Sequence, residues 1–327
     1  VITWKIQGIT PAGLAFHDLL LHLADWVEQA SDGRLVFDVY PSGAICPSLE
    51  SLDAVNTGVL DAVYDYSGMW IGKHKSAPLF CSTPGVLDAW DRVMWEWEGG
   101  GKELREELYT EVIGMDVHPI VAGAFGPELF MWSNTPLRTI DDFKGKNLRM
   151  MPLMGEVLNE NGISTVFLPY AEIIPALERG VLDACEYSLP FFDIGAGFPD
   201  VCKYYHYPGI HQPSSMQEIV INGDSWRALP DDLKSKLELV CHAQTLWCWH
   251  YTDALNIEAL EEFDKMGNEE VILDPETVDI MLGWAYDYLD KEAAKDPFFA
   301  KVWNSQSEWR DRWYPYADAI YFSHKLQ

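Results

Sequence analysis

A single arginine in the sequence is placed to bind a carboxylate. Arg149 closes the segment Asp142–Arg149, which predicts a loop and a short strand, and uncharged residues follow it up to Pro152. A guanidinium at a strand end beside an uncharged segment suits two-pronged binding of a carboxylate. A single arginine more often lies on the surface or bridges two lobes. Other segments of the sequence are therefore needed to support a carboxylate-binding role.

Three further segments supply oxygen ligands. Glu186 and Tyr187 end one predicted strand, Gln212 follows an aromatic strand that breaks at a Pro-Gly turn, and Glu128 lies on a strand that enters the second half of the chain. Two carboxylates, an amide and backbone carbonyls are the ligands of a Ca²⁺ or Na⁺ site. A 2-oxo or 2-hydroxy acid could complete such a shell.

Signatures of catalysis are missing from the sequence. It contains no glycine-rich phosphate loop, no GxSxG, no HExxH and no zinc-like cluster of His and Cys. The nine histidines are scattered, and the one close pair in an interesting place, His206 and His211, is interpreted as structural. We therefore expect a binding protein rather than an enzyme.

The net charge of the chain limits the classes of partner that it can bind. The formal charge of −28 repels nucleic-acid phosphates and anionic lipid surfaces, which argues against nucleic-acid binding. Such a charge is typical of a solvated surface that keeps a secreted protein soluble. A pocket for an anion must then carry its own positive charge, and Arg149 is the candidate to supply it.

Length and termini indicate a two-domain exported protein. A chain of 327 residues fits about two domains. No apolar run approaches the roughly 18 residues of a membrane span. The chain begins at Val1 rather than Met, which suggests that a signal peptide has been removed and that the mature protein is periplasmic. The six cysteines form no CxxC pair and leave the compartment open.

Strands and helices alternate in the first half of the chain, which predicts an α/β fold with mainly parallel sheets covered by helices. The predicted elements there are strands at 2–7 and 35–40 and helices at 14–30 and 49–57. From Leu229 the chain becomes largely helical. The predicted elements are a helix capped by Asp231 or Asp232 and running to about Met266, a strand at 270–273, and a helix from Pro275 to about Lys295.

An internal near-repeat predicts two similar lobes. The pentapeptide Gly-Val-Leu-Asp-Ala occurs at 58–62 and again at 180–184, each time after a predicted helix and before a strand that delivers a tyrosine. Each glycine fits a helix C-cap in the left-handed region. Two lobes of this construction would direct the carboxyl ends of their strands toward a shared cleft, where open α/β sheets bind ligands.

Taken together, these motifs resemble the solute-binding proteins of tripartite ATP-independent periplasmic (TRAP) transporters, and more narrowly the branch that binds 2-oxo acids or lactate with a metal. The resemblance covers nearly the whole chain and implies a two-lobed periplasmic-binding-protein fold with a helical C-terminal region. Its specific segments are 139–149, 168–177, 180–187, 205–209 and 293–298.

The resemblance also implies roles for individual residues. Arg149 falls at the family's carboxylate-binding arginine, and Glu186, the Tyr187 carbonyl and Gln212 fall at the metal ligands of that branch. Glu128 replaces a glutamine that lines the same site, and Tyr187 replaces a tryptophan. The extra carboxylate favours Ca²⁺ over Na⁺, but it could also repel the acid, which leaves the identity of the acid open.

Aromatic residues complete the expected site and assembly. Tyr66 and Phe191 are candidates to line the cleft, although a core position suits both equally well. The aromatic arm at 297–327 packs either on its own body or on a second subunit, and the resemblance implies a homodimer that exchanges its C-terminal helix. The expected division is 1–123 with about 215–250 for lobe I, 124–214 with about 251–296 for lobe II, and 297–327 for the arm.

The expected partners are a small organic acid, captured by hinge closure, and the membrane permease subunits of a TRAP transporter. Two alternatives stay open from the sequence. One is a protein of the same fold that binds another acid, aromatic or dicarboxylic, without metal. The other is an enzyme that uses a metal at Glu128 and Glu186 for hydrolysis or decarboxylation.

Overall fold

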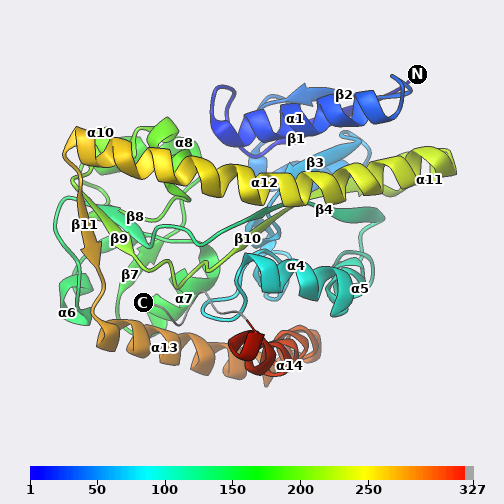
Figure 1. Cartoon of the computed structure of the whole chain (residues 1–327). Coiled ribbons are helices and arrows are strands. Elements are labelled where there is room, and N and C mark those ends of the chain that lie inside the picture. Colours follow the sequence, from blue (N-terminus) through cyan, green and yellow to red (C-terminus); the bar gives the residue numbers. More distant parts are fainter. Residues whose placement is uncertain (321–327) are drawn as a thin grey trace.

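Two β-sheets, one in each lobe, organise the computed structural model, which describes residues 1–320 (Figure 1). The first sheet has the order β2 (Leu35–Tyr40), β1 (Ile2–Gly8), β3 (Ala62–Asp65), β10 (Ser215–Asn222) and β4 (Val117–Phe125). The second has the order β11 (Glu269–Ile272), β9 (Tyr204–Tyr207), β5 (Met131–Ser133), β8 (Ala184–Cys185), β6 (Asn147–Arg149) and β7 (Ser164–Val166). The predicted two-lobed α/β fold is confirmed.

The sheets are mixed, with parallel strands grouped together. In the first sheet β2, β1 and β3 run parallel, and in the second β7, β6 and β8 run parallel. The antiparallel strands are β10, which pairs with both β3 and β4, and β5, which pairs with β8 and β9. Both of these antiparallel strands begin directly after a segment in which the chain passes between the lobes.

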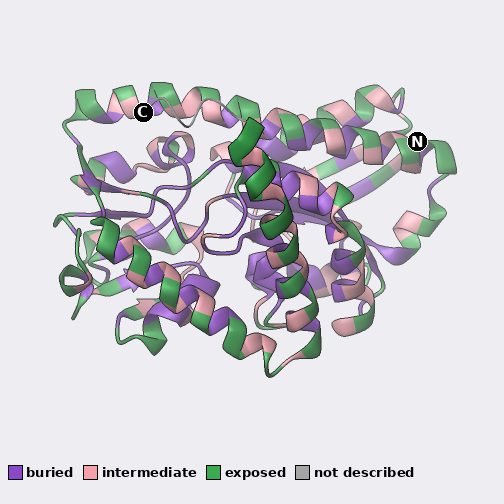
Figure 2. Ribbon diagram, turned by 60° about the horizontal axis from the view of Figure 1, so that its bottom comes forward, coloured by how far each residue is buried: buried purple, intermediate pink, exposed green. Residues whose placement is uncertain are grey.

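Helices cover both sheets, and their exposed faces are turned outward (Figure 2). In the first lobe and its loops they are α1 (Ala15–Ala30), η1 (Ser48–Glu50), α2 (Ser51–Asn56), η2 (Ser67–Trp70), α3 (Ala77–Cys81), α4 (Ala89–Glu98), α5 (Gly101–Glu107), a π-helical turn (Leu108–Val112) and α11 (Gly223–Ala228). In the second they are α6 (Ile140–Phe143), α7 (Pro152–Glu160), α8 (Tyr170–Glu178), α9 (Pro190–Ala196) and α10 (Phe198–Val201). None of the helices described in residues 1–320 combines the length and apolarity needed to cross a membrane.

The chain passes between the lobes three times before its C-terminal helices. Residues 126–130 join β4 to β5, residues 208–214 join β9 to β10, and the helix α12 (Asp231–Met266) packs on β4 and α1 in one lobe and on α9 in the other (Figure 1). The helix has the predicted extent, but Pro230 rather than an aspartate occupies its N-cap position. Because one apolar cluster runs through both lobes, they are packed closely together.

The two C-terminal helices lie across both lobes on the side opposite α12 (Figure 1). Helix α13 (Pro275–Ala293) packs on α7, and α14 (Pro297–Ile320) packs on α4 and α5. Gln306 fixes α14 by accepting a hydrogen bond from the Thr83 hydroxyl and donating one to the Leu79 carbonyl, both at 2.7 Å. The first half of the predicted aromatic arm therefore packs on its own subunit, while residues 321–327 lie outside the described chain.

The internal repeat corresponds to a matched piece of structure in each lobe. Asp61 donates its backbone N–H to the Lys5 carbonyl and accepts from the Lys5 N–H through its side chain, at 3.0 and 2.9 Å. Asp183 makes the same reciprocal pair with Asn147, at 2.9 and 2.8 Å. Each aspartate thus fixes the register of the following strand, β3 on β1 and β8 on β6. The repeat therefore marks two lobes of like construction.

The glycine of the second repeat copy is a testable part of this construction. Gly180 has φ of +67°, so Gly180→Ala should lower the free energy of unfolding by about 1 kcal/mol, because a Cβ disfavours the left-handed region. Gly283, exposed within α13, is the matched control, and Gly283→Ala should raise the same quantity by roughly 0.5–1 kcal/mol. Urea unfolding followed by circular dichroism measures both. Equal effects of the two substitutions would contradict the cap assignment.

Candidate functional site

The residues that the sequence singled out meet between the two lobes. Arg149 ends β6 and Glu186 follows β8, the neighbouring parallel strand, whereas Glu128 and Gln212 lie on the segments that pass between the lobes. All four side chains are buried. The site therefore combines one sheet edge with the two connecting segments, so that a movement of the lobes would change its shape.

Arg149 is held by Glu186. Nη1 of Arg149 lies 2.5 Å from Oε2 of Glu186 and donates a second hydrogen bond, of 2.9 Å, to the Glu186 carbonyl. The same Oε2 accepts from the Met151 N–H at 3.1 Å. The rings of Phe167 and Tyr170 face the guanidinium at 5.2 and 5.5 Å. Nη2 of Arg149 has one weak contact, 3.8 Å to the Met151 sulfur, so this edge of the fork can take an acceptor from a ligand.

Glu128 and Gln212 tie the two connecting segments together. Nε2 of Gln212 donates to Oε2 of Glu128 at 2.6 Å, and the Glu128 N–H donates to the Gln212 carbonyl at 3.1 Å. The close approach requires Gly209, where a Cβ would lie 1.9 Å from the Glu128 carbonyl oxygen. The Pro-Gly turn noted in the sequence is thus the place where the backbones touch.

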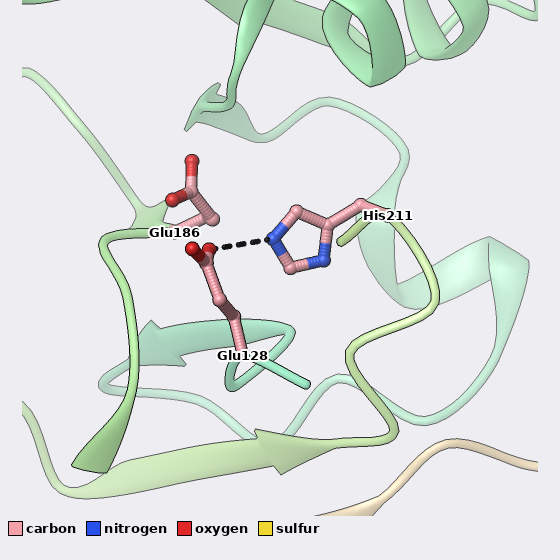
Figure 3. Close-up of side chains that lie close together, drawn as sticks. All are labelled: Glu128, Glu186 and His211. Atoms are coloured by element: carbon pink, nitrogen blue, oxygen red, sulfur yellow. Dashed lines mark ion pairs between the residues drawn. The ribbon is translucent and has the colours of Figure 1, made fainter. Parts of the chain in front are cut away.

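His211 joins the group, which the sequence did not predict. Its Nε2 lies 3.5 Å from Oε2 of Glu128 (Figure 3). The His211 ring packs edge-on against Phe130. Neither ring nitrogen has a hydrogen-bond partner within residues 1–320. The other histidine of the pair, His206, fits its structural interpretation, since its ring contacts the Met131 carbonyl at 2.8 Å and accepts from the Leu137 N–H at 3.1 Å. In the sequence, the position of His211 next to Gln212 could have indicated that His211 belongs to this group.

Burial dominates the protonation of the three polar side chains. It raises the pKa of Glu128 to about 7, against the hydrogen bond from Gln212, and raises the pKa of Glu186 to about 7, against the charge of Arg149. Burial lowers the pKa of His211 to about 4. At neutral pH the imidazole is therefore uncharged and keeps a free lone pair.

These acceptors suit a cation. Oε1 of Glu186 is buried without a hydrogen-bond partner in the described chain, as are both nitrogens of His211. One ligand atom each from Glu128, Glu186 and His211 lies within 4.8 Å of the others. Buried polar atoms without a partner are costly, and a metal ion could bind Oε1 of Glu186 and one ring nitrogen of His211 together. The donor set therefore fits a bound metal.

The aromatic candidates occupy different places. Tyr187 is buried, with its ring 5.1 Å from that of Tyr170, and the buried hydroxyl of Tyr66 has no hydrogen-bond partner in the described residues. Phe191 is half-buried and its ring faces Tyr251 at 6.1 Å. Its neighbour Phe192, which the sequence did not single out, stacks at 3.8 Å on Phe16 of the other lobe.

A narrow, largely apolar pocket adjoins the polar group. Its walls come from both lobes, and Gly68 and Met151 meet there, since a Cβ on Gly68 would lie 3.2 Å from the Met151 methyl carbon. The lining residues are Gly68, Pro78, Cys81, Ser82, Met151, Pro152, Leu153, Met154, His211 and Gln212. No lysine or arginine is among them.

The six cysteines of the chain, all within the described residues, are free thiols.

Comparison with known proteins gives one consistent result. Residues 8–281 match the family described as bacterial extracellular solute-binding protein, family 7. A monocarboxylate 2-oxoacid-binding periplasmic protein of Nostoc sp. is 26% identical over 309 residues, which cover 94% of this chain and 84% of the relative.

Two solved structures share the fold over almost their full length. A TRAP transporter solute-binding protein from Bordetella bronchiseptica, a dimer with calcium and picolinate, is 25% identical with a TM-score of 0.93, covering 98% of this chain and 95% of that one. A TRAP periplasmic solute-binding protein from Pseudoalteromonas atlantica with sodium and pyruvate is 24% identical with a TM-score of 0.92, covering 100% and 99%.

The buried ion pair makes a prediction for the free protein. Replacing Arg149 with Met leaves Glu186 buried without its partner, so Arg149→Met should lower the free energy of unfolding at pH 8 by about 3 kcal/mol. The double variant with Glu186→Gln should recover part of that loss, because the unpaired charge is gone. Urea unfolding of chelator-treated protein measures both.

An exposed ion pair supplies the control. Arg227 pairs with Asp116 on the surface, and Arg227→Met should leave the unfolding midpoint nearly unchanged. A loss from Arg149→Met no larger than that from Arg227→Met would show that the buried pair does not support the fold.

Proposed function

The chain belongs to family 7 of the bacterial extracellular solute-binding proteins, the periplasmic receptors of TRAP transporters, and from this we propose that it captures a small 2-oxo or 2-hydroxy monocarboxylate together with a metal ion. The family consists of transport proteins rather than enzymes, so the catalytic alternative is not pursued. The membrane permease subunits of such a transporter are the proposed partners.

The observation that carries this proposal is the buried group formed by Arg149, Glu186 and Glu128. A buried guanidinium that pairs with Glu186, with Glu128 as a second carboxylate nearby, gives both a site for an anion and acceptors for a cation. Pyruvate and picolinate, found in the two similar structures, share one feature: each carries a donor atom next to its carboxylate. Acids of that kind chelate a metal through both groups.

Each proposed ligand is assigned to groups of this site. Nη2 of Arg149, whose contact to the Met151 sulfur is weak, donates to the carboxylate of the acid. Glu186, the Tyr187 carbonyl and Gln212 hold the metal with Glu128 beside them, and the metal, when bound, neutralises the carboxylates and binds the acid. Two carboxylates favour Ca²⁺ over Na⁺, because the higher charge offsets more of their mutual repulsion.

The lobes would have to part for the acid to enter. Arg149 and its partners are buried, and the lobes touch at two further places, through Phe16 with Phe192 and through Gly68 with Met151. An acid that contacts groups of both lobes stabilises the closed arrangement, which the permease can then recognise. Tyr66, Tyr187 and Phe191 remain proposed contacts of the acid.

The pocket beside the metal ligands favours a monocarboxylate with an apolar tail. Its walls include Cys81, Met151 and Leu153, and no cationic side chain lines it. A second carboxylate there would be buried without a partner, at a cost that a methyl group does not incur. Succinate and similar dicarboxylates should therefore bind poorly.

The function is tested by ligand binding to chelator-treated protein with and without Ca²⁺. We expect pyruvate or lactate to raise the unfolding temperature only when the metal is present, with stabilisation of about 2.7 kcal/mol at 100 times the dissociation constant. Arg149→Lys should weaken the binding measured by calorimetry at least tenfold, because a point charge does not reproduce the planar fork. Arg227→Lys, far out on the surface, should not change it.

Each outcome of that experiment has a separate meaning. Stabilisation by succinate or benzoate without metal would keep the receptor assignment and replace the metal-bridged acid with another ligand. Unchanged affinity in Arg149→Lys would remove the proposed role of Arg149.

A homodimer is the proposed assembly. The last turns of α14 expose Tyr316 and Ile320, at 56% and 47%, whereas its first turns bury Phe299 and Val302 against their own subunit. Exposed apolar residues at a helix end favour burial in an interface. The similar Bordetella structure is a dimer. We therefore propose that the end of α14 contacts a second copy, with or without exchange of the helix.

Light scattering tests the assembly. The wild-type chain should have twice its 37.2 kDa mass, and Tyr316→Glu with Ile320→Glu should shift it toward a single chain, because charges replace the apolar contact. Leu239→Glu, at an exposed position of α12, is the control and should leave the mass unchanged. A wild-type protein that stays at the mass of one chain at high concentration would contradict the proposal.

A further inference from the structure

We propose that His211 is a ligand of the bound metal and that its imidazole makes this site prefer a first-row transition-metal dication, such as Co²⁺ or Zn²⁺, far more strongly than an all-oxygen site would. This inference rests on the proposed metal site and specifies its chemistry. It concerns a residue outside the ligand set expected from the sequence.

The state of the His211 side chain is the first step. Its ring is buried, with 2% of the residue exposed, and neither ring nitrogen has a hydrogen-bond partner among residues 1–320. Buried polar groups are nearly always satisfied, as are both nitrogens of His206 on the adjoining strand β9. An unsatisfied buried imidazole therefore points to a partner from outside the described chain.

The surroundings of the ring identify that partner as a cation. Nε2 of His211 lies 3.5 Å from a carboxylate oxygen of Glu128, and Glu186 contributes a second carboxylate with a buried, unpartnered Oε1 (Figure 3). The three ligand atoms lie within 4.8 Å of one another. Metal–ligand bonds of about 2.1 Å place opposite ligands roughly 4.2 Å apart, so small side-chain shifts would bring all three to one ion.

A hydrogen bond between His211 and Glu128 is the simplest competing explanation. It would need a proton on Nε2 and a shorter, better aligned contact than the 3.5 Å separation. It would also leave Oε1 of Glu186 without a partner among residues 1–320. A metal ion would take Oε1 of Glu186 and one ring nitrogen of His211, whereas this hydrogen bond would take the ring nitrogen alone.

The nitrogen ligand determines the class of metal. Ca²⁺ and Na⁺ are bound in proteins by oxygen, and an imidazole adds little to their affinity. Imidazole suits Zn²⁺, Co²⁺ and their neighbours, while the carboxylates of Glu128 and Glu186 accept either class. One imidazole with two carboxylates is thus a mixed site in which His211 sets the preference between the two classes.

The test compares two metals in three proteins. Metal-depleted wild type, His211→Asn and His250→Asn are each titrated by calorimetry with Co²⁺ and, separately, with Ca²⁺. His250 is exposed on α12 and controls for loose binding of Co²⁺ to surface imidazoles. The measured quantity is the ratio of the Ca²⁺ to the Co²⁺ dissociation constant, which cancels any general weakening of the site.

We expect His211→Asn to lower this ratio at least roughly tenfold, mainly through weaker Co²⁺ binding, and His250→Asn to leave it within about twofold. A ratio that is the same in His211→Asn and wild type overturns the assignment. X-ray absorption at the cobalt edge of the wild-type protein needs no variant to fold. Imidazole scattering from a nitrogen at about 2.1 Å supports the assignment, and its absence overturns it.

Pyruvate separates this inference from the proposed function. If pyruvate binds only with metal while His211→Asn leaves the ratio unchanged, the receptor function stands and the His211 ligand is refuted. If the ratio depends on His211 but pyruvate binds with neither metal, the His211 ligand stands and the proposed acid is wrong.

Discussion

The buried contact between Arg149 and Glu186 is the interaction on which the rest of the cleft depends. Burying a guanidinium is costly without a counter-charge, and Glu186 reaches Arg149 because β6 and β8 are parallel neighbours whose register places Arg149 opposite Cys185. That register is fixed by the reciprocal hydrogen bonds of Asp183 with Asn147, at the end of a helix that stops at Gly180. The chain of causes thus runs from a glycine and an aspartate in the sequence to the position of the charge in the site.

The other half of the site belongs to the segments that connect the lobes, and this links binding to closure. Glu128 and Gln212 hydrogen-bond to each other across those segments, so the relative position of the two segments is set inside the site itself. A ligand that contacted Glu128, Gln212 and Arg149 together, as proposed, would therefore be sensitive to any movement between the lobes. The lobes also touch where Gly68 meets Met151. The candidate site is thus built in part from the segments that connect the lobes.

The sequence predicted the features that depend on residues close together in the chain. It did not predict the features that depend on residues far apart in the chain. The two Gly-Val-Leu-Asp-Ala segments predicted matching pieces of two lobes, because helix caps and strand starts are set by nearby residues. Arg149, Glu186, Glu128 and Gln212 were each named from residue type, and they lie together. The lack of partners for His211 and the stacking of Phe192 on Phe16 were not foreseen, since both depend on which side chains the other lobe brings near. The antiparallel strands β5 and β10 likewise follow from the passage of the chain between lobes, which no local pattern records.

Charge balance favours the proposal that an acid and a dication bind together in this cleft. When ionised, Arg149 with Glu128 and Glu186 carries a net charge of −1, from one positive and two negative groups, in a place without exposure to water. The protein meets that imbalance in the free state by holding protons, which is why burial raises the pKa of both carboxyl groups to about 7. A monocarboxylate alone would deepen the imbalance to −2, and a monovalent cation would return it only to −1. A dication with a monocarboxylate brings the sum to zero, and charges are least costly to bury when they cancel. The second glutamate thus supports the proposal that the acid and a dication bind together rather than separately.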